Sequence, residues 1–264
     1  MTADPRVRFT HDIPRLQALT RPGATALVQG DTRWSYAEWD AAIDAAAQQL
    51  ATHGVRPGDR VAVIGENGLV VATLIHAIAR RRAWPMILNA RLSAREIDVI
   101  LTHAQARLAV CAIDVSSDAA SHARRIDAAT ARWGALPALQ VSATRAAEPE
   151  PVSDDPNHDV GALIYTSGTT GAPKGVMLTH ANLLHVAHWS GALRGMTDAD
   201  RVLAALPISH VFGLTSVFLA STLYGATVHL VARFDPQATL ALIAREGVTV
   251  FQGCLLYTSD AADE

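Results

Sequence analysis

The residues best suited to chemistry lie in one short polar segment, residues 165–175, with the sequence YTSGTTGAPKG. Apolar runs flank it at residues 162–164 and 176–178, so we expect a loop between two buried segments. Glycines let backbone N–H groups turn toward one point, and the hydroxyl groups and Lys174 add further donors. Because each charge-assisted hydrogen bond contributes roughly 1.5–3 kcal/mol, the pattern predicts a polyphosphate-binding loop.

Two other kinds of loop share part of this composition. Gly, Ser, Thr and Pro also dominate ordinary surface turns, but a plain turn rarely carries this many donors together with a lysine. The segment is not a Walker A loop either, because Pro173 occupies the position of the second glycine in G-x-x-x-x-G-K-[ST]. The chain contains no G-x-G-x-x-G and no G-x-S-x-G motif.

A second candidate lies at residues 206–214, LPISHVFGL. Pro207 is expected to end a strand and Gly213 to open a helix, which displays His210 at the carboxyl edge of a sheet, where open α/β folds bind ligands. His185 and His188 share one face of an expected helix, but no third ligand has a clear spacing, so we predict no metal site.

Both segments resemble motifs of the acyl-adenylate-forming enzymes, which include acyl-CoA synthetases, aryl-CoA ligases and peptide-synthetase adenylation domains. Residues 166–175 match the phosphate-binding signature [ST]-[SG]-G-[ST]-[ST]-G-x-P-K-G at every fixed position, and residues 206–213 resemble L-P-x-x-H-x-x-G of the CoA-ligase branch. Residues 82–92 resemble a third motif, in which Arg82 replaces the usual glycine and Ile87 and Ala90 replace two prolines.

The resemblance implies an ATP-dependent carboxylate–CoA ligase. A small carboxylic acid attacks the α-phosphorus of ATP, pyrophosphate leaves, and CoA then displaces AMP from the acyl-adenylate; ATP, Mg²⁺ and CoA are implied, and fatty-acid metabolism is one implied setting. His210 would line the acyl pocket and position the carboxylate. The residues implied to hold the β- and γ-phosphates are Thr166, Ser167, Gly168, Thr169, Thr170, Gly171 and Lys174.

Two alternatives stay open on the sequence. The acceptor could be a carrier-protein thiol or an amine rather than CoA. The 264 residues by themselves could also be a non-catalytic, truncated nucleotide-binding fragment, because the resemblance covers residues 20–253, roughly the first half of a family member. The missing part would hold the ribose-binding aspartate, the magnesium glutamate and the catalytic lysine of the C-terminal domain. We therefore expect the fragment alone to be inactive.

Alternating strand and helix patterns predict an α/β fold of mostly parallel sheets flanked by helices, the truncated N-terminal part of the adenylate-forming fold. Strands are expected at residues 60–64, 85–88 and 107–112, and helices at 69–79, 93–103 and 118–133. Capping-box spacings at Ser35/Glu38 and Ser93/Glu96 mark two helix starts. A Pro- and acid-rich stretch near residue 150 suggests one subdomain at 1–150 and a second, incomplete one at 151–253.

Charge, apolar runs, cysteine content and the last eleven residues narrow the class of protein further. A net charge of −3 and a pI near 6.4 give no reason to expect nucleic acid, and no run of eighteen apolar residues predicts a transmembrane helix. Two cysteines fit a reducing cytoplasm, and the oligomeric state stays open. Residues 254–264, CLLYTSDAADE, match one reading frame of a transposase-end adapter used in sequencing libraries, so we expect a non-native tail.

Overall fold

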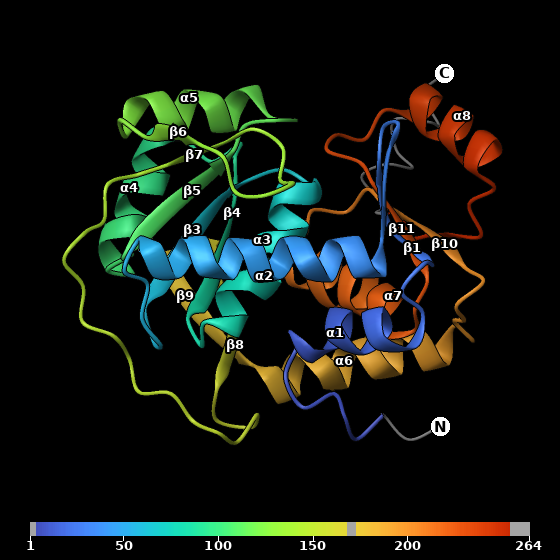
Figure 1. Cartoon of the computed structure of the whole chain (residues 1–264). Helices are drawn as coiled ribbons and strands as arrows, with labels where there is room; N and C mark the ends of the chain where they lie inside the picture. The colour runs from blue at the N-terminus through green and yellow to red at the C-terminus, as the bar shows by residue number, and fades with distance from the viewer. Residues whose placement is uncertain (1–3, 168–172, 254–264) are drawn as a thin grey trace.

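The structure is a computed structural model that describes residues 4–167 and 173–253. Within these residues the strands form two sheets, one of seven and one of five strands. Figure 1 shows helices on the faces of both sheets, so the expected α/β class is confirmed.

The seven-stranded sheet has the order β6-β7-β5-β3-β4-β8-β9. Its centre, β5-β3-β4-β8, is parallel, whereas β6, β7 and β9 pair antiparallel at the two edges. The central strands are buried on both faces, as the continuous apolar runs predict. The bounds are β3 Arg60–Gly65, β4 Trp84–Asn89, β5 Leu108–Ala112, β6 Ala129–Ala131, β7 Leu139–Val141, β8 Val160–Ser167 and β9 Pro173–Thr179.

The five-stranded sheet has the order β12-β10-β11-β1-β2, with β2 antiparallel at one edge. Its strands come from both ends of the chain: β1 Thr25–Gln29, β2 Thr32–Ser35, β10 Arg201–Ala204, β11 Thr227–Leu230 and β12 Val250–Phe251. The subdomain boundary near residue 150 stays a prediction. It falls between β7 and β8, and each sheet takes strands from both sides of it.

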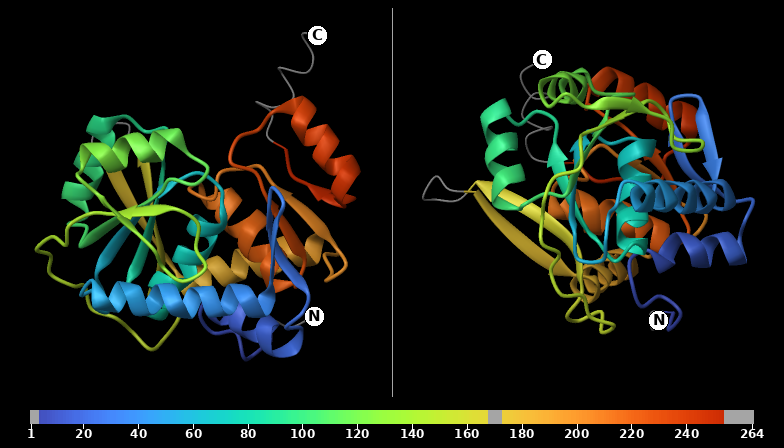
Figure 2. Two further views of the ribbon diagram at one scale, coloured as in Figure 1. Left: turned by 45° about the horizontal axis from the view of Figure 1, so that its top comes forward. Right: turned by 60° about the vertical axis from the view of Figure 1, so that its left-hand side comes forward.

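Helices join the two sheets through one shared core. Helix α3 is buried on almost every side, as its uniformly apolar sequence requires, and α2 runs along both sheets (Figure 2). Trp39 of α2 and Phe218 of η1 pack edge to face at 5.9 Å in this core. The bounds are α1 Asp12–Thr20, α2 Tyr36–Thr52, α3 Leu69–Arg80, α4 Ala94–His103, α5 Ser117–Arg125, α6 His180–Leu193, the π-helix η1 Gly213–Leu219, α7 Ala220–Leu223 and α8 Pro236–Glu246.

Local signals predicted the helix starts well. Both capping boxes are present, and Asp235 caps α8. The helix expected over residues 118–133 is wrong in length, because α5 ends at Arg125, Asp127 adopts a left-handed conformation (φ 52°) and the chain continues into β6. Helix α1 was not predicted, and the helix expected to carry His185 and His188 is α6, which begins at His180.

Candidate functional site

The signature segment lies on an antiparallel hairpin made by β8 and β9. Thr166 is directly opposite Lys174, and Ser167 is opposite Pro173. Cross-strand partners project to the same face of a hairpin, with Cβ atoms about 5 Å apart. Thr166 and Lys174 are both exposed, so a hydroxyl and an ammonium group are presented side by side next to the loop.

The structure therefore brings together the two ends of the signature. No hydrogen bond or ion pair within the described residues occupies Lys174. The predicted phosphate ligands Gly168, Thr169, Thr170 and Gly171 lie outside the described residues. Their role stays a prediction.

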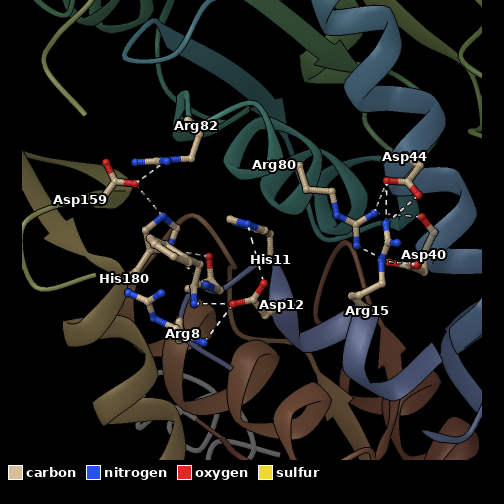
Figure 3. A network of polar contacts seen from close by, with 12 residues as sticks. Arg8, His11, Asp12, Arg15, Asp40, Asp44, Arg80, Arg82, Asp159 and His180 are labelled. Atoms are coloured by element: carbon tan, nitrogen blue, oxygen red, sulfur yellow. Dashed lines mark hydrogen bonds and ion pairs between the residues drawn. The ribbon is translucent and has the colours of Figure 1, made fainter. Parts of the chain in front are cut away.

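The opposite end of the hairpin is held by a buried polar cluster, drawn in Figure 3. Asp159 precedes β8 and His180 follows β9, and the backbone N–H of His180 donates to the carbonyl oxygen of Asp159 at 3.0 Å. The backbone N–H of Thr10 donates to His180 Nδ1 at 3.1 Å. His180 Nδ1 is therefore an acceptor, and the neutral ring carries its proton on Nε2, 3.8 Å from Asp159 Oδ2. The N-terminal arm is thus bonded to the base of the signature hairpin.

Burial keeps the histidines of this cluster neutral. It lowers the pKa of His180 to about 3, with the charges of His11 and Arg82 adding to the effect. Burial likewise lowers the pKa of His11 to about 4.

Arg82 completes the cluster in an unusual conformation. Its φ of 57° lies in the left-handed region that favours glycine. Its guanidinium group bonds Asp159 Oδ2 at 3.2 Å through Nε and the Ser153 carbonyl oxygen at 2.6 Å through Nη2. The departure from the usual glycine at this position thus places a cation beside a carboxylate that is 3% exposed.

His210 lies on a turn that follows β10. Its backbone N–H donates to the Pro207 carbonyl oxygen at 3.0 Å, and its ring Nδ1 accepts from the Phe212 N–H at 3.3 Å. The side chain is exposed, as expected for a residue displayed at a sheet edge. No described contact joins His210 to Thr166 or Lys174.

Near His210, the carboxyl ends of strands from both sheets meet around a cavity of about 20 Å³, the size of one water molecule. Glu66, whose side chain is 3% exposed, accepts from Arg91 Nε at 3.0 Å and from Arg233 Nε at 3.1 Å. Arg233 also pairs with Asp118 at 2.7 Å. The cavity is lined by Gly65, Glu66, Asn67, Val71, Asn89, Arg91, Pro207, Ser209 and Ala232.

Sequence reasoning missed Glu66 and Arg233. A signal was available for Glu66, because it directly follows a strand with a continuous apolar run at residues 61–64, and ligands bind at the carboxyl ends of parallel strands. No local pattern distinguished Arg233, since its partner is 167 residues away.

Comparison with known proteins decides the family. The model of the AMP-binding enzyme family matches residues 15–254. The chain belongs to this family. The α/β fold and the signature hairpin agree with that membership.

Individual relatives include CoA-forming enzymes. The chain is 36% identical to a feruloyl-CoA synthase from an Amycolatopsis species over 91% of its own length and 47% of that protein. The o-succinylbenzoate CoA synthetase MenE from Bacillus subtilis, bound to its acyl-adenylate intermediate, superimposes with a TM-score of 0.75 at 28% identity, covering 96% of this chain and 64% of that one. The complex of MenE with ATP and a magnesium ion superimposes with a TM-score of 0.74 at 28% identity, covering 96% of this chain and 51% of that one. The chain spans about half the length of the curated relatives it matches.

Across residues 4–167 and 173–253, no group of three or more His, Cys, Asp or Glu side chains could hold a metal ion. No helix in the same residues is both long and apolar enough to span a membrane.

Proposed function

We propose that the protein to which this chain belongs is an ATP-dependent carboxylate–CoA ligase. The observation that carries the proposal is the signature hairpin, in which Thr166 and Lys174 are cross-strand partners beside the phosphate-binding sequence. Membership of the AMP-binding family and likeness to a feruloyl-CoA synthase support it.

The reaction has two balanced steps. A carboxylate oxygen attacks the α-phosphorus of ATP, the bond to the pyrophosphate oxygen breaks, and an acyl-adenylate remains. The sulfur of CoA then attacks the acyl carbon, AMP leaves and the thiol proton is released. A carboxylate is a weak nucleophile and ATP is polyanionic, so the protein must align the attack and stabilise the departing charge.

Lys174 is the residue best placed to stabilise the pyrophosphate. Of the 22 Lys and Arg residues in the chain, all but Lys174 are arginine. Arginine and lysine are not interchangeable, because an ammonium group is a compact charge on a flexible stem whereas guanidinium is a rigid fork. A single lysine in an arginine-rich chain, located at the signature, indicates that this position requires the ammonium group.

The other roles follow the predicted motif. Thr166 and Ser167, with residues 168–171, would donate to the β- and γ-phosphates, and His210 would position the carboxylate. Mg²⁺ usually binds through one or two carboxylates together with the phosphates of a substrate, so it needs no cluster of protein ligands. Magnesium enters the proposal as a companion of the ATP phosphates.

The acceptor, the location and the activity of the isolated chain belong to the proposal as well. CoA is favoured over a carrier-protein thiol or an amine by the His210 motif and by the CoA-forming relatives. We place the protein in the cytoplasm, where the buried free thiol of Cys111 is stable. We expect the 264 residues alone to catalyse no ATP–pyrophosphate exchange.

Labelling of Lys174 tests nucleotide binding in the chain itself. An acyl-phosphate derivative of ATP transfers its acyl group to an amine held near the terminal phosphate, forming an amide and releasing ATP. Apart from the N-terminal amine, Lys174 is the one primary amine in the chain, so mass spectrometry locates the adduct without ambiguity. We expect ATP to protect Lys174 better than AMP, which lacks the β- and γ-phosphates.

The control variant is Lys174→Arg, which keeps the charge and removes the amine. Equal labelling of Lys174 with and without excess ATP would contradict the proposed phosphate site. For the full-length protein, the decisive measurement is carboxylate-dependent ATP–pyrophosphate exchange followed by AMP release with CoA, a phosphopantetheinyl carrier or an amine. Exchange without CoA-dependent product would reassign the acceptor.

A further inference from the structure

Asn67 connects the two sheets at the edge where the candidate site lies. It follows β3 by two residues and is 4% exposed. Its Nδ2 donates to the carbonyl oxygens of Ala204 and Leu206, both at 2.9 Å, and its Oδ1 accepts from the Ile208 N–H at 2.8 Å. The side-chain amide of one residue just after β3 thus makes hydrogen bonds to three backbone groups of a short segment at the end of β10, in the other sheet.

The contacts fall where regular pairing stops. Strand β10 ends at Ala204, and the chain then turns toward His210. Beyond the strand end, the Leu206 carbonyl and the Ile208 N–H have left the sheet ladder. Asn67 supplies the hydrogen-bond partners of these two backbone groups, which would otherwise be costly to bury.

The same segment carries His210. Ile208 lies within the turn closed by the hydrogen bond from the His210 N–H to the Pro207 carbonyl oxygen. At the far side of this turn, Gly213 packs so closely that a Cβ there would lie 2.1 Å from the Pro207 carbonyl oxygen. The turn is therefore fixed at one end by Asn67 and at the other by the start of η1.

We propose that Asn67 is a positioning residue for the acyl-adenylate reaction: through Leu206 and Ile208 it holds the His210 turn in place against the carboxyl edge of the seven-stranded sheet. The inference rests on the proposed function for its catalytic meaning. Its structural content, that Asn67 sets the position of His210, can be tested independently of any activity.

Gln29 provides a matched control. Its Oε1 accepts from the Leu69 N–H at 2.7 Å and its Nε2 donates to Asp114 at 2.9 Å. This amide bonds the start of α3, two residues from Asn67, without touching residues 204–208. Gln29→Ala therefore removes a similar number of hydrogen bonds nearby and leaves the His210 turn held.

The first experiment uses the 264-residue chain. Hydrogen–deuterium exchange at the Ile208 amide should become about ten-fold faster or more in Asn67→Ala, because at least one net hydrogen bond is lost there, and should be unchanged in Gln29→Ala. The ¹⁵N shifts of the His210 imidazole should move in the first variant only. If Asn67→Ala does not fold, Asn67→Asp replaces it: the shape is kept, but an oxygen then faces the Ala204 and Leu206 carbonyls, and the His210 shifts should again move.

Unchanged His210 shifts in a folded Asn67 variant would overturn the inference. The second experiment uses the full-length protein, where Asn67→Ala should raise KM for the carboxylic acid and lower kcat while KM for ATP stays within about two-fold, unlike Gln29→Ala. If Asn67→Ala and Gln29→Ala change KM and kcat to the same extent, Asn67 has a purely structural role. If His210 moves but the wild-type protein forms no acyl-adenylate, the proposed function fails while the link from Asn67 to His210 stands.

Discussion

Replacing Arg82 separates two opposing effects at one position. Its backbone, with φ of 57°, is strained for any residue that has a Cβ, whereas its side chain pairs with the buried Asp159. Glycine removes both the strain and the ion pair, and alanine removes the ion pair alone. Comparing Arg82→Gly with Arg82→Ala therefore isolates the backbone term.

The magnitudes follow from the geometry. Removing one partner of a buried ion pair costs about 3–5 kcal/mol, and the Asp159 side chain is 3% exposed whereas that of Arg82 is 27% exposed. The pair with Asp154, which is 98% exposed, contributes little. A left-handed residue with a Cβ costs about 1–2 kcal/mol relative to glycine. We expect Arg82→Ala to lose about 4 kcal/mol of unfolding free energy and Arg82→Gly about 3 kcal/mol.

Urea unfolding followed by tryptophan fluorescence measures the unfolding free energy of both variants. Trp39 and Trp133 are fully buried, so their fluorescence changes when the chain unfolds. Arg95→Ala, an exposed arginine on α4, serves as the control and should change stability by less than about 0.5 kcal/mol. Adding Asp159→Asn to Arg82→Gly should restore part of the loss by removing the uncompensated charge. Equal stabilities of the Gly and Ala variants would refute the strain argument, and wild-type stability in both would refute the ion-pair argument.

Three further outcomes are expected. Since the folded-state pKa values of His11 (about 4) and His180 (about 3) lie below the ordinary value near 6.5, their contribution to stability should be complete above pH 6.5 and decline as the pH falls toward 4, by about 2 kcal/mol per histidine at pH 5. Burial lowers the pKa of His76 and His229 as well, so in His180→Asn urea titrations should show a decline that is smaller by about 2 kcal/mol at pH 5. Gly213→Ala should lower stability by about 1–3 kcal/mol, because the new Cβ meets a backbone carbonyl oxygen at 2.1 Å, whereas Gly23→Ala, with open space around it, should melt like the wild type. Sequencing of the genomic locus by an independent library method should show different codons after Gly253; a native reading frame through residues 254–264 would disprove the adapter origin of the tail.

Local sequence signals determined much of this fold. The Ser35 and Ser93 capping boxes, the Asp235 cap and the buried central strands are set by neighbours within four residues or by runs of apolar side chains, so they can be read without the tertiary structure. The signature predicts a phosphate-binding segment, because backbone flexibility, hydroxyl donors and a lysine are adjacent in the chain and can meet one ligand. The structure adds that Thr166 faces Lys174.

Long-range pairing decided the rest. Strand β1 pairs with β11 across some 200 residues, so the five-stranded sheet combines strands from both ends of the chain. Asn67 meets its partners 137 to 141 residues away, and Arg82 adopts a left-handed conformation beside a carboxylate 77 residues distant. Sequence periodicity and local motifs do not predict these long-range hydrogen bonds, because the partners come together only when the two sheets pack. The sequence thus predicted which segment would meet phosphate, and the tertiary structure decided which residues pack and hydrogen-bond around that segment and the His210 turn.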